Sequence, residues 1–132
     1  MIFDQQQELF LIDPPFLKFF KENKEWLVPY AAFCYLRDKN KTANFRKWSE
    51  FQVYNAEEVN QLCADNKASY PDIAVHYFIQ YYAHKQLLDA AEYARANGVV
   101  LKGDIPIGIS PDSVEAWTHP ELFNLEDRKS VV

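Results

Sequence analysis

Glycine is scarce in this chain of 132 residues: only Gly98, Gly103 and Gly108 occur, all inside one window of 11 residues. Glycine is used where the backbone needs a positive φ or approaches another group closely. Its absence from the rest of the chain predicts a mostly helical protein with one tightly turned region. That region is where we look first for chemistry.

Cysteine and basic charge are also in short supply, and long apolar runs are missing. Cys34 and Cys63 are too few for a secreted disulfide scaffold and lack a CxxC spacing, so we expect buried structural thiols. The formal net charge of −5 argues against general binding to nucleic acid or to an anionic membrane. No apolar stretch approaches the roughly 20 residues that span a bilayer, and the N-terminus lacks the features of a signal peptide.

What is present is a high apolar content, with 48% hydrophobic and 16% aromatic residues. Such a composition is too apolar for an intrinsically disordered chain. Together with the absences above, it predicts a soluble, cytoplasmic globular protein. The eight tyrosines and three tryptophans could stack on sugar rings, but the helical spacing of most of them favours packing in a core.

Apolar residues at helical spacing, together with capping residues, predict four helices before residue 98. The first begins at Pro14 and ends in the polar residues 22–24. A second begins near Glu25 or Trp26, has Pro29 in its first turn and ends at 38–41. Trp48 falls in a polar loop. Asn55 caps a third helix that reaches about residue 65, and the longest helix runs over about 72–97.

The sequence after this helix predicts a short strand. Gly98 follows Ala96-Asn97 as a helix stop, and Val99–Leu101 is a β-branched run typical of a buried strand. Asp104 stands at the end of this run, and Pro106 cannot continue a central strand. A short helix follows, with Ser110 or Asp112 as its cap. This order is typical of one unit of a parallel α/β fold, in which chemistry lies at the carboxyl ends of strands.

Asp104 is the leading candidate for a functional residue, because it lies between two glycines at the end of the expected strand. It could face a ligand or an arginine, or it could simply cap its own loop backbone, and both alternatives stay open. His76 and His84 are eight residues apart, and His119 lies elsewhere, so no metal site is expected. The glycines spell no nucleotide-binding motif, so no cofactor is expected either.

Three segments resemble the 4-alpha-glucanotransferases, also called amylomaltases or disproportionating enzymes, of glycoside hydrolase family 77. Residues 16–33 contain WLVPYAAF, and residues 77–87 read YFIQYYAHKQL. The most specific segment is VLKGDIPIG at 100–108, followed by Asp112-Ser113, Trp117 and the PELF of 120–123. The resemblance covers about residues 14–125 and is most similar to versions from gut-type Bacteroidetes.

The resemblance implies a (β/α)8 TIM barrel with an inserted helical subdomain, of which this chain is a mostly helical part. Such enzymes move α-1,4-glucan segments between maltooligosaccharides by a retaining double displacement, without a metal or cofactor. Their nucleophile and acid/base lie downstream of the segment that carries Asp104, so the resemblance implies no catalytic residue here. Asp104 and Pro106 then support the active site or bind substrate.

By the same resemblance, residues 1–70 belong to the helical subdomain and residues 71–125 to a helix–strand–loop unit of the barrel. Residues 126–132 depart from the family's Gly/Ala/Pro-rich continuation, and we expect them to be a non-native tail. The chain is thus expected to be a glucanotransferase fragment that is inactive alone. The alternative is a small helical interaction or binding domain without catalysis, which would fold stably by itself.

Overall fold

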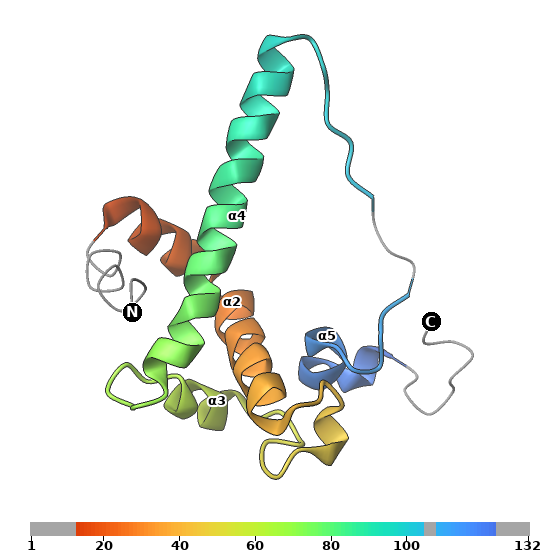
Figure 1. The fold of residues 1–132 in the computed structure, drawn as a ribbon. Helices are drawn as coiled ribbons and strands as arrows, with labels where there is room; N and C mark the ends of the chain where they lie inside the picture. Colours follow the sequence, from red (N-terminus) through yellow and green to blue (C-terminus); the bar gives the residue numbers. More distant parts are fainter. Residues whose placement is uncertain (1–12, 105–107, 124–132) are drawn as a thin grey trace.

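In the computed structural model, residues 13–104 and 108–123 are described, and within these ranges the chain forms helices and loops but no strand. A long helix crosses a second, bent helix, and the short helices gather around one end of this pair (Figure 1). The elements in chain order are α2 (Pro14–Asn40), η1 (Phe45–Lys47), α3 (Ala56–Leu62), α4 (Tyr70–Ala96), α5 (Val114–Thr118) and η2 (Pro120–Leu122).

Helix α2 is one continuous helix, so the predicted break at residues 22–24 is wrong. Asn23 keeps this polar stretch helical, because its amide donates to the carbonyl of Phe19 (2.8 Å) and its Oδ1 accepts from the indole of Trp26 (2.9 Å). Pro29 lies inside the helix instead of at its start and removes one helical hydrogen bond. Figure 1 shows α2 bent where it passes α4, as a proline inside a helix produces.

The predictions for α3 and α4 are confirmed in their main features. The side chain of Asn55 accepts a hydrogen bond from the amide of Glu58 (3.1 Å) and so caps α3. Helix α4 ends at Ala96, and Gly98, two residues further on, has a φ of +76°. The amides of Gly98 and Val99 donate to the carbonyls of Arg95 (3.1 Å) and Ala94 (2.8 Å), the pattern with which a left-handed residue closes a helix.

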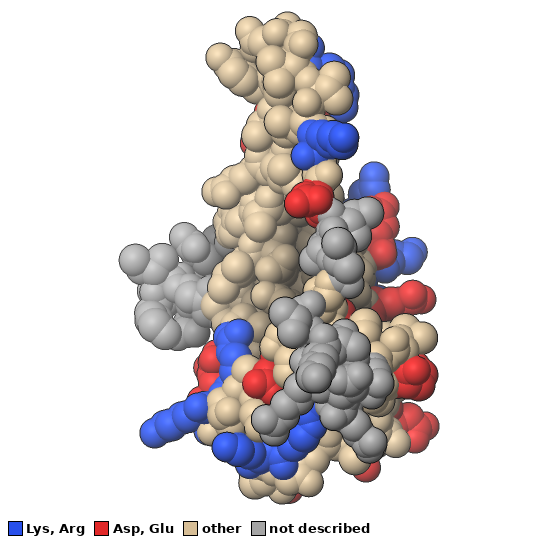
Figure 2. Space-filling model, turned by 90° about the vertical axis from the view of Figure 1, so that its right-hand side faces the viewer, with Lys and Arg blue, Asp and Glu red and all other residues tan. Residues whose placement is uncertain are grey.

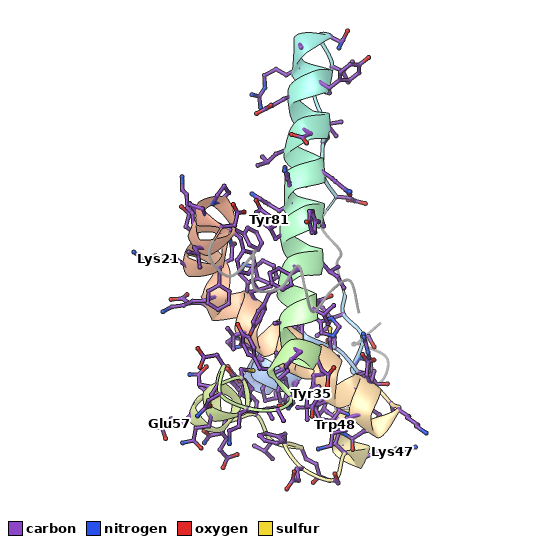
Figure 3. All side chains as sticks on the ribbon, turned by 60° about the vertical axis from the view of Figure 1, so that its left-hand side comes forward. Lys21, Tyr35, Lys47, Trp48, Glu57 and Tyr81 are labelled. Carbon is purple, nitrogen blue, oxygen red and sulfur yellow. The ribbon has the colours of Figure 1, made fainter. Side chains whose placement is uncertain are left out.

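Two hydrophobic clusters hold the helices together, and α2 contributes to both. Figure 3 shows Tyr81 of the first cluster beside the N-terminal part of α2, and Trp48 of the second nearer the opposite end of that helix. The first cluster consists of Phe16, Phe19, Leu27, Ala31, Ile73, Ala74, Tyr77, Phe78 and Tyr81. The second consists of Ala32, Phe33, Leu36, Phe45, Trp48, Val59, Ala116 and Trp117.

Trp48 belongs to the core, and its predicted place in a polar loop is wrong. Its side chain is only 1% exposed, and its indole N–H donates to the carbonyl of Thr42 (2.7 Å). The ring packs against Phe33 and Trp117, with centroids 5.4 and 5.6 Å away. The surrounding residues are polar in sequence, but Trp48 fills a site that α2 and α5 supply from far along the chain.

The predicted buried strand at Val99–Leu101 is also wrong for the described chain. These three residues are 53%, 89% and 54% exposed and extend from the free end of α4 (Figure 1). A parallel strand is stabilised by hydrogen bonds to neighbouring strands, and the described residues supply none. The fold class that the structure supports here is therefore helical.

The cap of α5 also differs from expectation. Ser113 caps the helix by accepting from the amide of Ala116 (3.3 Å), in place of Ser110 or Asp112. Neither of the two 27-residue helices, nor any other described helix, is apolar over a length that would cross a bilayer.

Candidate functional site

Asp104 lies on the exposed segment that follows α4, and the structure gives it no partner among the described residues. It neither caps the described part of its own loop nor meets an arginine there. A Cβ at Gly103 would have nothing within 4 Å, so no close approach explains that glycine. Pro106 lies outside the described residues. The expected grouping of Asp104 with other functional side chains is thus not seen here.

Helix α5, which comes after Asp104 in the chain, is anchored to the rest of the molecule. The indole of Trp117 is 1% exposed and donates to the carbonyl of Phe51 (2.9 Å), a residue with a φ of +63°. Arg46 and Asp112 form an ion pair (3.6 Å), although both side chains are about two-fifths exposed. Such an exposed pair adds little stability, so the buried indole is the stronger anchor.

A pocket of about 700 Å³ lies between α2, Tyr54 and the α5 region. This volume lies in the range of small-molecule sites in proteins. Aromatic rings and two carboxylates surround it. The lining residues are Glu25, Trp26, Pro29, Tyr30, Tyr54, Val114, Glu115, Thr118 and His119.

The aromatic side chains of this pocket have defined positions. The ring of Trp26 is 47% exposed and is oriented by the hydrogen bond from its indole to Asn23. Tyr30 meets Trp26 edge to face at 6.3 Å, and its hydroxyl accepts from the amide of Gln80 (3.3 Å). Desolvation by burial raises the pKa of Tyr30, so this hydroxyl stays protonated at neutral pH.

Sequence reasoning missed this pocket, since its residues come from three separated segments. The sequence shows Trp26 and Leu27 only as two adjacent apolar residues of a helix, which point in different directions, and the structure shows that Leu27 is the buried one. The expected packing of tryptophans in a core holds for Trp117 but not for Trp26, and Trp48 is buried although a polar loop is predicted for it.

The cysteines and histidines form no common site in the described chain. Burial raises the pKa of Cys34 and raises that of Cys63 to about 11, so both thiols are poor nucleophiles at neutral pH. Cys34 is buried, and Cys63 is partly buried. The ring of His84 packs on Phe19 at 5.0 Å, while His76 faces Asp38 at 3.9 Å. Across the described ranges, no three potential metal-ligating side chains gather.

Residues 2–131 match the family of the 4-alpha-glucanotransferases, glycoside hydrolase family 77. Because the match extends over nearly the whole chain, the chain belongs to this family of transferases, as the sequence segments at 16–33, 77–87 and 100–123 predict.

Individual relatives agree with this assignment. The chain is 41% identical over 124 residues to the 4-alpha-glucanotransferase DPE2 of Oryza sativa subsp. japonica, covering 94% of this chain and 13% of the rice protein. It is 30% identical to the 4-alpha-glucanotransferase of Clostridium butyricum, covering 86% and 23%, and 25% identical to that of Synechocystis, covering 87% and 22%. No solved structure matches.

The chain thus spans from about an eighth to under a quarter of the length of these relatives. They come from a plant and from bacteria, and the particular likeness to Bacteroidetes stays a prediction.

Proposed function

We propose that these residues form part of a cytoplasmic 4-alpha-glucanotransferase that moves α-1,4-glucan segments between maltooligosaccharides. The observation that carries the proposal is the family match over residues 2–131. The relatives' names describe the same activity. In this proposal, the (β/α)8 barrel is completed by parts of the enzyme other than the residues described here, and the exposed Val99–Leu101 becomes one of its strands.

The chemistry of a retaining transfer indicates which residues of the enzyme carry out catalysis and which support it. A retaining transfer needs a nucleophile and an acid/base roughly 5–5.5 Å apart in one pocket. Asp104 has no carboxylate partner among the described residues, which supports placing both catalytic groups elsewhere in the enzyme. We assign Asp104 and Pro106 to support of the active site or to substrate binding.

The same proposal divides the chain into two structural units. Residues 1–70 form the helical subdomain, and residues 71–125 form a helix–strand–loop unit. Helix α4 connects the two units, since its first half packs in the cluster around Phe16 and its second half carries the chain toward Val99.

The test is an assay with maltotriose on two proteins. The 132-residue chain should release no glucose above background, because it lacks the two groups that carry the reaction. A longer enzyme that contains this chain should release glucose and form longer maltooligosaccharides. In that enzyme, Asp104→Asn should lower kcat/KM by at least about tenfold.

The matched control is Asp89→Asn, which removes an exposed carboxylate on the far half of α4 and should leave transfer unchanged. Turnover by the 132-residue chain would contradict the placement of the catalytic groups. Full activity of the Asp104→Asn enzyme would contradict the role given to that residue. A longer enzyme without any transfer would favour a helical binding domain instead.

A further inference from the structure

We propose that the pocket beside Trp26 is a binding site for a neutral α-1,4-glucan chain, with the exposed indole as its platform. The choice of an α-1,4-glucan rests on the proposed function, whereas the choice of a neutral sugar rests on the pocket itself. The site would hold a glucan by binding alone, because the described residues around it include no activated nucleophile.

The aromatic surface fits one face of a sugar ring. A pyranose has an apolar face of C–H groups, which packs on a broad aromatic ring, and a rim of hydroxyls that need polar partners. Trp26 is the one tryptophan of the described chain that is about half exposed, since Trp48 and Trp117 are each 1% exposed. Its hydrogen bond to Asn23 fixes the ring in advance, which lowers the entropic cost of binding.

The polar groups of the pocket favour a ligand whose hydroxyls donate hydrogen bonds. Glu25 and Glu115 line the pocket from two different elements, and neither is engaged in an ion pair within the described structure. Carboxylates accept charge-assisted hydrogen bonds, which are stronger than neutral ones. The described lining contains no lysine or arginine to balance these two carboxylates, which disfavours an anionic ligand such as a sugar phosphate.

The arrangement of the rings argues against a quaternary ammonium ligand. A quaternary ammonium site is an aromatic cage, with several ring faces turned toward the charge. Here Tyr30 meets Trp26 edge to face, with an angle of 61° between the rings. Tyr54 packs against the buried Trp117 at 5.0 Å. The rings therefore offer one broad platform and not a cage, which suits the face of a sugar better than a quaternary ammonium group.

The experiment is a titration of the ¹⁵N-labelled 132-residue chain with maltotetraose, followed through the three indole N–H signals. The Trp26 signal should move and saturate at millimolar sugar, while the signals of Trp48 and Trp117, which donate to buried carbonyls, should stay in place. Trp26→Ala should weaken binding at least about tenfold, measured by the amide signals of Glu115 and Thr118. Glu115→Gln, which keeps the shape, should weaken it about fivefold.

The matched control is Tyr93→Ala, which removes a 74% exposed aromatic ring far from this pocket and should leave the titration unchanged. The proposal is overturned if maltotetraose moves no signal, if cellotetraose binds equally well, or if choline binds and the sugar does not. Sugar binding without transfer by the longer enzyme would refute the proposed function and leave a glucan site. Transfer without sugar binding here would refute this inference alone.

Discussion

His76 shows how one side chain can make the stability of this fold depend on pH. Its side chain is only 15% exposed and lies on α4 against the end of α2, with Asp38 at 3.9 Å and Arg37 nearby. Desolvation by burial lowers the pKa of His76 below its ordinary value of 6.5, and the carboxylate of Asp38 offsets part of this effect. The folded state therefore favours neutral imidazole.

We expect the free energy of unfolding to fall as the pH is lowered from 7.5 through 6.5 toward 5. Over this range, the unfolded chain takes up a proton at His76 more readily than the folded chain does, so protonation favours unfolding. Urea titrations across the range measure the slope, and His76→Gln should flatten it. The control is His119→Gln, at a side chain that is 61% exposed. An unchanged slope in His76→Gln would show that other groups cause the dependence.

Helix α3 has only seven residues, and a cap and one buried residue stabilise it. Asn55 satisfies the amide of Glu58 at 3.1 Å, and Val59 is fully buried in the second cluster. We expect Asn55→Ala to lower the free energy of unfolding by about 1 kcal/mol, because the orphan amide loses its acceptor. Thermal and urea unfolding measure this loss. Asn60→Ala, in the exposed middle of the same helix, should change stability by less than about 0.5 kcal/mol.

The features that could be predicted from sequence are the helix ends that depend on residues nearby in the chain. The cap at Asn55 and the stop at Gly98 each depend on hydrogen bonds within five residues, so local patterns reveal them. The continuity of α2 depends on side-chain bonds of Asn23 that a pattern of polar residues does not disclose. The burial of Trp48 and the pocket at Trp26 depend on α5, which is distant in sequence.

The prediction of a strand at Val99–Leu101 is wrong for a different reason. An apolar, β-branched run indicates only that a segment suits a sheet, and whether it forms a strand depends on partner strands. The described residues offer none, so the segment lies exposed. The same helix–strand unit predicts a role for Asp104, whereas the family resemblance alone implies one for Pro106, and both roles stay proposals.

At the scale of the whole molecule, stability is concentrated at one end. The far half of α4 extends beyond both clusters (Figure 1). It bears exposed apolar side chains. Figure 2 shows this extension mostly without charged side chains on the face in view. The exposed apolar residues of α4 and the segment after it are Ile79, Tyr82, Leu87, Leu88, Tyr93, Val99, Val100 and Leu101.

We expect hydrogen exchange to divide α4 into two parts. Amides of residues 74–81 should exchange at least about tenfold more slowly than those of 86–95, because only the first part is covered by buried side chains. Amides of 100–104 should exchange without protection. Mass spectrometry of peptic peptides measures these rates. Strong protection over 100–104 in the 132-residue chain would mean that the segment pairs after all.

The anchoring of Trp117 beneath Phe51 means that the covalent connection after α4 is not what keeps α5 in place. Lys102 lies in the exposed stretch and is a site for trypsin, whereas Ala116 and Trp117 are buried against α2 and the Trp48 region. A chain nicked there would be a two-piece assembly whose halves stay associated. The same position is therefore a natural split point, at which two separately made peptides could reconstitute the molecule.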